Sequence, residues 1–134
     1  WDIGTTVWDS KNGKFFIDVL IRKNTKFPVE VTRKYYTQSE GQKEIECDVT
    51  ESKTGELDPD KVKKRHVKML QIPNARSRGN GCPVEVMFKV NRNGIATFDF
   101  VDVQSGTRHT FEEDLGGGGQ QDGGHDPFAG FTIQ

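Results

Sequence analysis

The chain lacks the features that would mark an enzyme, a membrane span or a nucleic-acid-binding protein. Its net charge is −1, with 19 Lys and Arg against 20 Asp and Glu, so no excess of charge favours a polyanion or a membrane surface. No apolar run approaches the ~20 residues of a membrane helix. The 3 histidines have no ligand-like spacing to the cysteines, and no nucleophile stands beside a base in a recognisable motif. We therefore expect neither catalysis nor a metal site.

Cysteine is also scarce, with only Cys47 and Cys82 present. Cys47 falls within an alternating strand pattern, which favours a small buried hydrophobe, and Cys82 lies in a loop beside Pro83. Two free thiols are favoured, although a disulfide between them remains an alternative. Free thiols suggest a reducing compartment, and we expect a cytoplasmic protein. The chain starts at Trp1 and reads as an excised fragment, so a targeting signal would lie outside it.

Apolar residues make up only 32% of the chain, and two segments account for much of the deficit. Residues 51–66 are highly charged, which predicts a solvated loop with at most one helical turn, capped by Asp58 or Asp60. Residues 114–134 are rich in glycine and cannot bury enough surface to offset their chain entropy. We therefore expect a folded domain at 1–113 and a flexible tail at 114–134.

The remaining sequence shows the period-two alternation of half-buried antiparallel strands. Residues 44–49 alternate acidic and apolar side chains, with Glu44, Glu46 and Asp48 expected on the outward face. Residues 84–90 repeat the pattern, and Asn93-Gly94 after them is a strong hairpin signal. Further strands are expected at 2–9, 14–21, 29–38, 66–71, 95–103 and 107–112. About eight short strands joined by tight turns predict an all-β sandwich or barrel.

Four segments occur in the same order as in the DnaK family of 70-kDa heat-shock chaperones, which the chain resembles. Residues 19–28 (VLIRKNTKFP) resemble that family's LIPRNTTIP, and residues 72–75 (IPNA) are similar to its IPPAP turn. Residues 83–95 (PVEVMFKVNRNGI) resemble PQIEVTFDIDANGIL, and residues 102–107 (DVQSGT) resemble DKSTGK. The resemblance implies the substrate-binding domain, a sandwich of two four-stranded antiparallel sheets. In that domain, loops at one end hold an extended hydrophobic peptide through backbone hydrogen bonds and one apolar pocket.

The resemblance also implies a set of peptide-binding residues. Ile45 matches the central pocket, while Trp8 and Gln38 match residues that arch over the peptide. The full set is Thr5, Trp8, Tyr35, Gln38, Ile45, Cys47, Val49 and Val84. Plain core packing remains the alternative for Ile45 and its strand neighbours, and an ordinary buried or interface aromatic for Trp8. Trp8 is larger, and Thr5 and Gln38 are more polar, than is usual for the family, so a divergent member is expected. Residues 9–18 are expected to form a longer connection than the family's.

The expected function is therefore that of a chaperone module that holds unfolded, apolar segments, without enzymatic activity. The resemblance implies no cofactor in this fragment, with ATP in the absent ATPase domain and a DnaJ-type co-chaperone as a further partner of the full protein. We expect the family's helical lid and its linker to the ATPase domain to be missing from this fragment. The alternative is a protein-interaction β domain with a degenerate groove that recognises one specific partner.

Two interpretations of the tail remain open. Residues 116–131 resemble the Gly/Phe-rich region of DnaJ co-chaperones, most clearly at residues 125–128 (HDPF). The apolar run that carries Phe128, Phe131 and Ile133 on a flexible tether is also the kind of segment that such a groove accepts. The tail is therefore a candidate ligand for its own groove or a neighbour's.

Overall fold

A computed structural model of the chain describes residues 1–38, 41–78 and 81–115. Within these residues the fold is all-β, as predicted. The eight strands are β1 (Asp2–Asp9), β2 (Lys14–Ile21), β3 (Val29–Tyr36), β4 (Glu44–Ser52), β5 (Lys63–Gln71), β6 (Pro83–Val90), β7 (Ile95–Asp102) and β8 (Arg108–Asp114). The two short 3-10 turns are η1 (Pro59–Lys61) and η2 (Ala75–Arg78).

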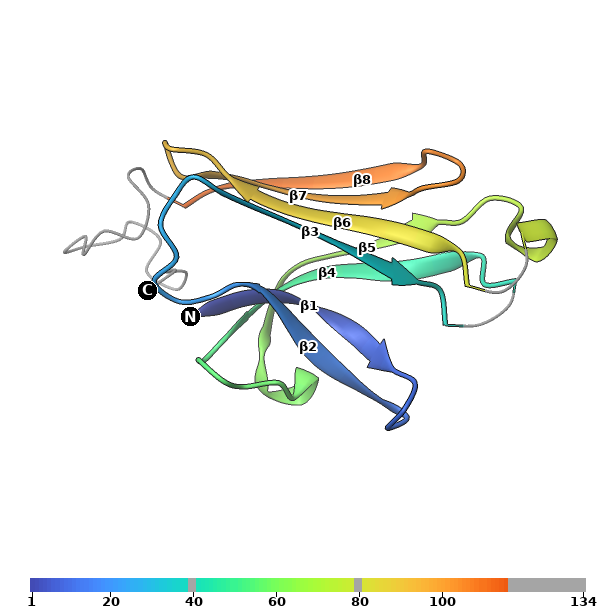
Figure 1. Cartoon of the computed structure of the whole chain (residues 1–134), viewed down its shortest axis with the longest axis horizontal. Coiled ribbons are helices and arrows are strands. Elements are labelled where there is room, and N and C mark those ends of the chain that lie inside the picture. The colour runs from blue at the N-terminus through green and yellow to red at the C-terminus, as the bar shows by residue number, and fades with distance from the viewer. Residues whose placement is uncertain (39–40, 79–80, 116–134) are drawn as a thin grey trace.

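The strands form two four-stranded antiparallel sheets that face each other (Figure 1). The first sheet has the order β2-β1-β4-β5 and the second the order β3-β6-β7-β8. The predicted sandwich is therefore confirmed. Among the described residues, two pairings join strands that do not follow each other along the chain, β1–β4 and β3–β6.

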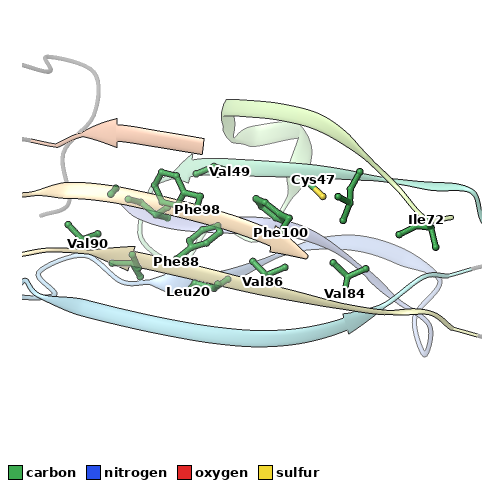
Figure 2. Packing of buried hydrophobic residues seen from close by; sticks show 14 of the residues in the cluster. Leu20, Cys47, Val49, Ile72, Val84, Val86, Phe88, Val90, Phe98 and Phe100 are labelled. Atoms are coloured by element: carbon green, nitrogen blue, oxygen red, sulfur yellow. The ribbon is translucent and has the colours of Figure 1, made fainter. Parts of the chain in front are cut away.

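The core lies between the sheets and is built from the inward-facing residues of each alternating strand. Phe88 and Phe98 are fully buried and meet edge to face, with ring centroids 4.8 Å apart. Phe100 lies 6.1 Å from Phe88, while Cys47 and Val49 face these rings from the first sheet (Figure 2). Aromatic pairs in this arrangement add to the stabilisation gained from apolar burial.

Local turn chemistry sets the hairpin registers. The Asp9 carboxylate accepts hydrogen bonds from the backbone of Lys11 (2.9 Å) and the side chain of Asn12 (2.6 Å), and Gly13 adopts a φ of 63°. The β1–β2 connection is therefore a tight turn, and β2 already begins at Lys14. The turn itself spans residues 10–13, so most of residues 9–18, expected to form a longer connection than the family's, is paired strand.

The prediction of a solvated loop over residues 51–66 is also wrong at both ends. Strand β4 continues to Ser52, and strand β5 begins at Lys63. The connection between them is shorter, and the carbonyl of Leu57 accepts a 3.0 Å hydrogen bond from the Ile17 backbone at the edge of β2. Within it, Asp58, one of the two residues expected to cap a helical turn, caps η1.

Two smaller expectations also differ from the structure. Asp48, assigned to an outward face, is only 1% exposed because its carboxylate lies between β4 and β1, where Thr5 and Thr6 donate to it. Strand β8 runs one residue past the expected boundary at 113, and Leu115 is buried with its N–H donated to the carbonyl of Gly94 at 2.7 Å.

A charged cluster, in which Glu51 is buried and the other members are half-buried, joins the two sheets. Arg65 of β5 contacts Glu113 of β8 at 3.0 Å and Glu51 of β4 at 3.6 Å. His66 adds a 3.2 Å contact to Glu113 and stacks on Phe111. Burial raises the pKa of Glu51, and the Arg65 charge opposes this shift. The cluster thus combines the desolvation of carboxylates with their pairing to Arg65.

Candidate functional site

A groove of about 690 Å³ opens at the end of the sandwich where the β1–β2 turn and the β3–β4 connection lie. This volume is typical of ligand sites, which span ~300–1,000 Å³. Seven of the eight residues expected to bind peptide line it: Thr5, Trp8, Tyr35, Gln38, Ile45, Cys47 and Val84. The structure therefore brings together side chains from four strands and one loop that are far apart in sequence.

Val49 does not line the groove. It is fully buried in the core, two residues beyond Cys47 on the same face of β4. The groove ends at Cys47 because the strands come together beyond it. Core packing, the alternative left open from the sequence, describes the position of Val49. The suggested tail ligand at Phe128, Phe131 and Ile133 lies outside the described residues.

The groove exists because β1 and β4 separate. Their ladder covers only Asp2–Gly4 of β1 and Thr50–Ser52 of β4, although β1 continues to Asp9 and β4 starts at Glu44. Beyond Gly4 the β1–β2 hairpin swings away from β4 (Figure 1). We call the gap between the diverging segments, Thr5–Asp9 and Glu44–Val49, the fork.

Backbone groups on the β4 side of the fork face the gap. The N–H of Ile72 donates to the carbonyl of Lys43 at 2.7 Å, in line with the β4–β5 register. Because alternate residues of an antiparallel strand bond to the same neighbour, the odd-numbered residues from Lys43 onward face β5. The backbone groups of Glu44, Glu46 and Asp48 therefore point toward β1.

The β1 side of the fork is arranged in the same way. The N–H of Ile17 points away from β1, toward Leu57, so its register partner Thr6 directs its own groups away from β2. The N–H of Thr6 accordingly reaches Asp48 Oδ1 at 2.8 Å. Trp8, two residues further, has the same orientation. Both edges of the fork thus offer backbone donors and acceptors to an inserted strand.

The floor of the groove is apolar. Cys47, Val84, Val86 and Phe100 are each 2% exposed and continue into the core. Ile45 is half-buried and packs against the same cluster. Burial, with a smaller contribution from Asp48 and then Glu46, raises the pKa of Cys47 to about 12, so this residue is a neutral thiol at physiological pH. The floor suits an aliphatic side chain and has no charged group to bind a polar one.

Aromatic side chains form the walls. Trp8 and Phe15 lie opposite each other in the β1–β2 hairpin and meet edge to face at 4.9 Å. Phe15 is 51% and Tyr36 61% exposed, and Met69 is also exposed. The rim thus combines these apolar side chains with polar ones, such as Lys34 and Glu44, above an apolar floor.

Two polar contacts shape the ends of the groove. Tyr35 donates its hydroxyl to Asp18 across the gap between the sheets, and burial followed by this carboxylate raises the pKa of Tyr35. The Gln42 side chain accepts from the N–H of Gln38 at 2.9 Å and donates to the carbonyl of Glu44 at 2.9 Å. The loop after β3 is thereby tied to the start of β4.

Sequence reasoning missed Phe15 and Asp48. A signal for Phe15 was present, because the Lys11-Asn12-Gly13 turn sets the register that pairs Phe15 with Trp8. Asp48 had no local signal, since its role depends on β1 lying beside β4. Within the described residues, no group of three or more His, Cys, Asp or Glu side chains could hold a metal ion. The same residues contain no helix long and apolar enough to cross a membrane.

The chain is therefore an all-β domain of the class in which two antiparallel sheets form a sandwich with a groove at one end. The chain matches the family model described as Hsp70 protein over residues 9–123, which is most of its length. The chain therefore belongs to the 70-kDa heat-shock protein family, and its fold is that of the family's substrate-binding β domain. No curated protein matches the chain.

Proposed function

We propose that the groove binds an extended apolar segment of an unfolded protein as an added strand in the fork. The observation that supports this most strongly is the open fork, whose two edges present backbone groups above an apolar floor. Backbone pairing is insensitive to side-chain identity, whereas the pocket beside Ile45 selects an aliphatic residue. Filling such a pocket contributes about 1.5–3 kcal/mol.

Titration with a fluorescent Leu-rich heptapeptide tests this function. Wild-type protein should bind it saturably, and Ile45→Asp should weaken binding at least about tenfold because a carboxylate replaces the apolar contact. Val103→Asp is the matched control, since Val103 is exposed and lies outside the groove. Absence of saturable binding by wild-type protein, with circular dichroism showing the fold intact, would exclude the proposal.

In this proposal the domain has no enzymatic activity or cofactor of its own. Within a full-length parent, ATP bound by a separate ATPase domain and a DnaJ-type co-chaperone would regulate peptide release. A cytoplasmic location remains an expectation from the cysteines alone. These parts of the proposal rest on family membership and require the full-length protein for their test.

The second candidate is an interaction domain for one specific partner. The observation that favours it is that side chains of the chain itself already bond to backbone groups of the fork. Asp48 accepts from the N–H of Thr6, and Gln42 donates to the carbonyl of Glu44. A panel of unrelated apolar peptides distinguishes the candidates. Comparable affinity across the panel supports the chaperone, and binding of a single sequence supports the specific partner.

We also propose the chain's own tail as a ligand. Leu115 is held beside Gly94, at the end of the sandwich away from the groove. Six strand residues cover about 20 Å. Twelve residues of Gly-rich composition, as the sequence has from Gly116 to Pro127, predict a root-mean-square length of roughly 17–21 Å. The tether therefore matches the distance along the strand. Deleting residues 116–134 should strengthen peptide binding, and equal affinity with and without them would exclude tail docking.

A further inference from the structure

The ladder between β1 and β4 stops at a defined position. Its last pair is Gly4 with Thr50, and the next pair in the same register would be Thr6 with Asp48. In that pair the N–H of Thr6 would donate to the backbone carbonyl of Asp48. It donates instead to the side-chain Oδ1 of Asp48 at 2.8 Å. A carboxylate thus stands where the backbone of β4 would otherwise be.

The hydrogen bonds of this carboxylate fix its place between the strands. Asp48 Oδ1 also accepts from the Thr5 hydroxyl at 2.9 Å, and Oδ2 accepts from the Thr6 hydroxyl at 2.6 Å. The ammonium of Lys64 lies 3.5 Å from Oδ2. Asp48 is only 1% exposed, so these donors replace the water it has lost.

We infer that Asp48 is a wedge that opens the peptide groove. Its carboxylate holds β1 one side-chain length away from β4 and so keeps the next backbone groups, at Trp8 and Glu46, available to an incoming strand. Asp48 is thus a positioning residue rather than a peptide contact. The role in peptide affinity rests on the proposed function, whereas the role in holding the strands apart does not.

A simpler explanation is that sheet twist separates β1 from β4 and that Asp48 merely fills the gap. Both explanations predict that loss of the carboxylate destabilises the fold, because Thr6 loses an acceptor. They differ in what the strands do next. Without a wedge, β1 and β4 should continue their ladder through Thr6 and Trp8; if twist dominates, the fork should stay open.

Amide hydrogen exchange on the whole chain without peptide separates these explanations. In Asp48→Ala, the exchange of the Trp8 and Glu46 amides should slow at least about tenfold, once the change in global unfolding has been corrected for. In Asp48→Asn the amide oxygen still accepts from Thr6 and the NH2 group can donate to its hydroxyl, so protection should stay within about threefold of wild type. Unchanged protection in folded Asp48→Ala would overturn the wedge.

Asp48→Thr is the second variant if Asp48→Ala does not fold, since threonine favours strands and the same amides report the same outcome. The peptide titration forms a separate arm, in which Asp48→Ala should bind at least about tenfold more weakly and Asp48→Asn about as well as wild type. Failure of wild-type protein to bind any peptide would contradict the proposed function. The exchange data would still decide whether Asp48 holds the fork open.

Discussion

At the scale of single residues, burial raises the pKa values of two groove side chains above those of the free amino acids. Cys47 combines 2% exposure with a pKa raised to about 12. Tyr35 remains protonated, because burial and the Asp18 carboxylate raise its pKa, and so acts as a hydrogen-bond donor between the sheets. Neutral, buried groups at the groove floor favour an apolar ligand.

The Cys47 thiol should react slowly. At pH 8 its thiolate fraction is about a thousandfold below that of a free cysteine, because its pKa lies far above the usual ~8.5. Alkylation by iodoacetamide, followed by peptide mapping, should therefore proceed at least about a hundredfold more slowly in the folded protein than in urea. A folded-state rate close to that in urea would contradict the burial of Cys47.

At the scale of secondary structure, the β1–β2 hairpin is the element that makes the groove. Its tight turn projects Trp8 and Phe15 as one wall, and its departure from β4 opens the fork. The sequence predicted both strands and the turn, because alternation and turn chemistry are local signals. It did not predict the fork, since nothing local states which strand lies beside β1 or where their ladder ends.

Phe15→Ala should separate binding from stability. Phe15 is 51% exposed and contacts Trp8, so its loss should cost less than about 1.5 kcal/mol of unfolding free energy. The same change removes part of the groove wall and should weaken peptide binding several-fold in fluorescence titration. Leu57→Ala is the control, because Leu57 is equally exposed but lies outside the groove. Equal peptide affinities of the two variants would show that Phe15 is not part of the site.

At the scale of the whole molecule, the sheets are held together by the apolar core, the charged cluster and the Tyr35–Asp18 hydrogen bond. The apolar core was predictable from inward-facing positions, and seven of the 20 residues that line the groove followed from the family resemblance. The charged cluster of Arg65, Glu51 and Glu113 was not predictable, because Arg65 and Glu51 lie in a segment whose composition is typical of a solvated loop and Glu113 lies far from both in sequence. Their pairing depends on β5 and β8 facing each other across the sandwich.

Arg65→Met should destabilise the fold by up to about 3–5 kcal/mol at pH 7, because the buried Glu51 and the half-buried Glu113 lose the Arg65 charge. Urea unfolding at several pH values measures this.

The folded-state pKa of Glu51 is already raised and should rise further in the variant. A carboxyl group whose pKa is raised on folding destabilises the folded state at pH values above that pKa, and this destabilisation disappears as the group is protonated. The variant should therefore regain stability as the pH falls from 7 toward the unfolded Glu value of ~4.3. A deficit that stays constant over this window would contradict the role of Glu51.

The central claim is that a peptide enters the fork as an added strand, and amide hydrogen exchange with and without a saturating Leu-rich heptapeptide tests it most directly. The amides of Trp8 and Glu46 face the fork, whereas those of Val7 and Cys47 already face neighbouring strands. Peptide should therefore protect the first set and leave the second nearly unchanged. Saturable binding that protects neither Trp8 nor Glu46 would contradict strand addition and place the peptide elsewhere.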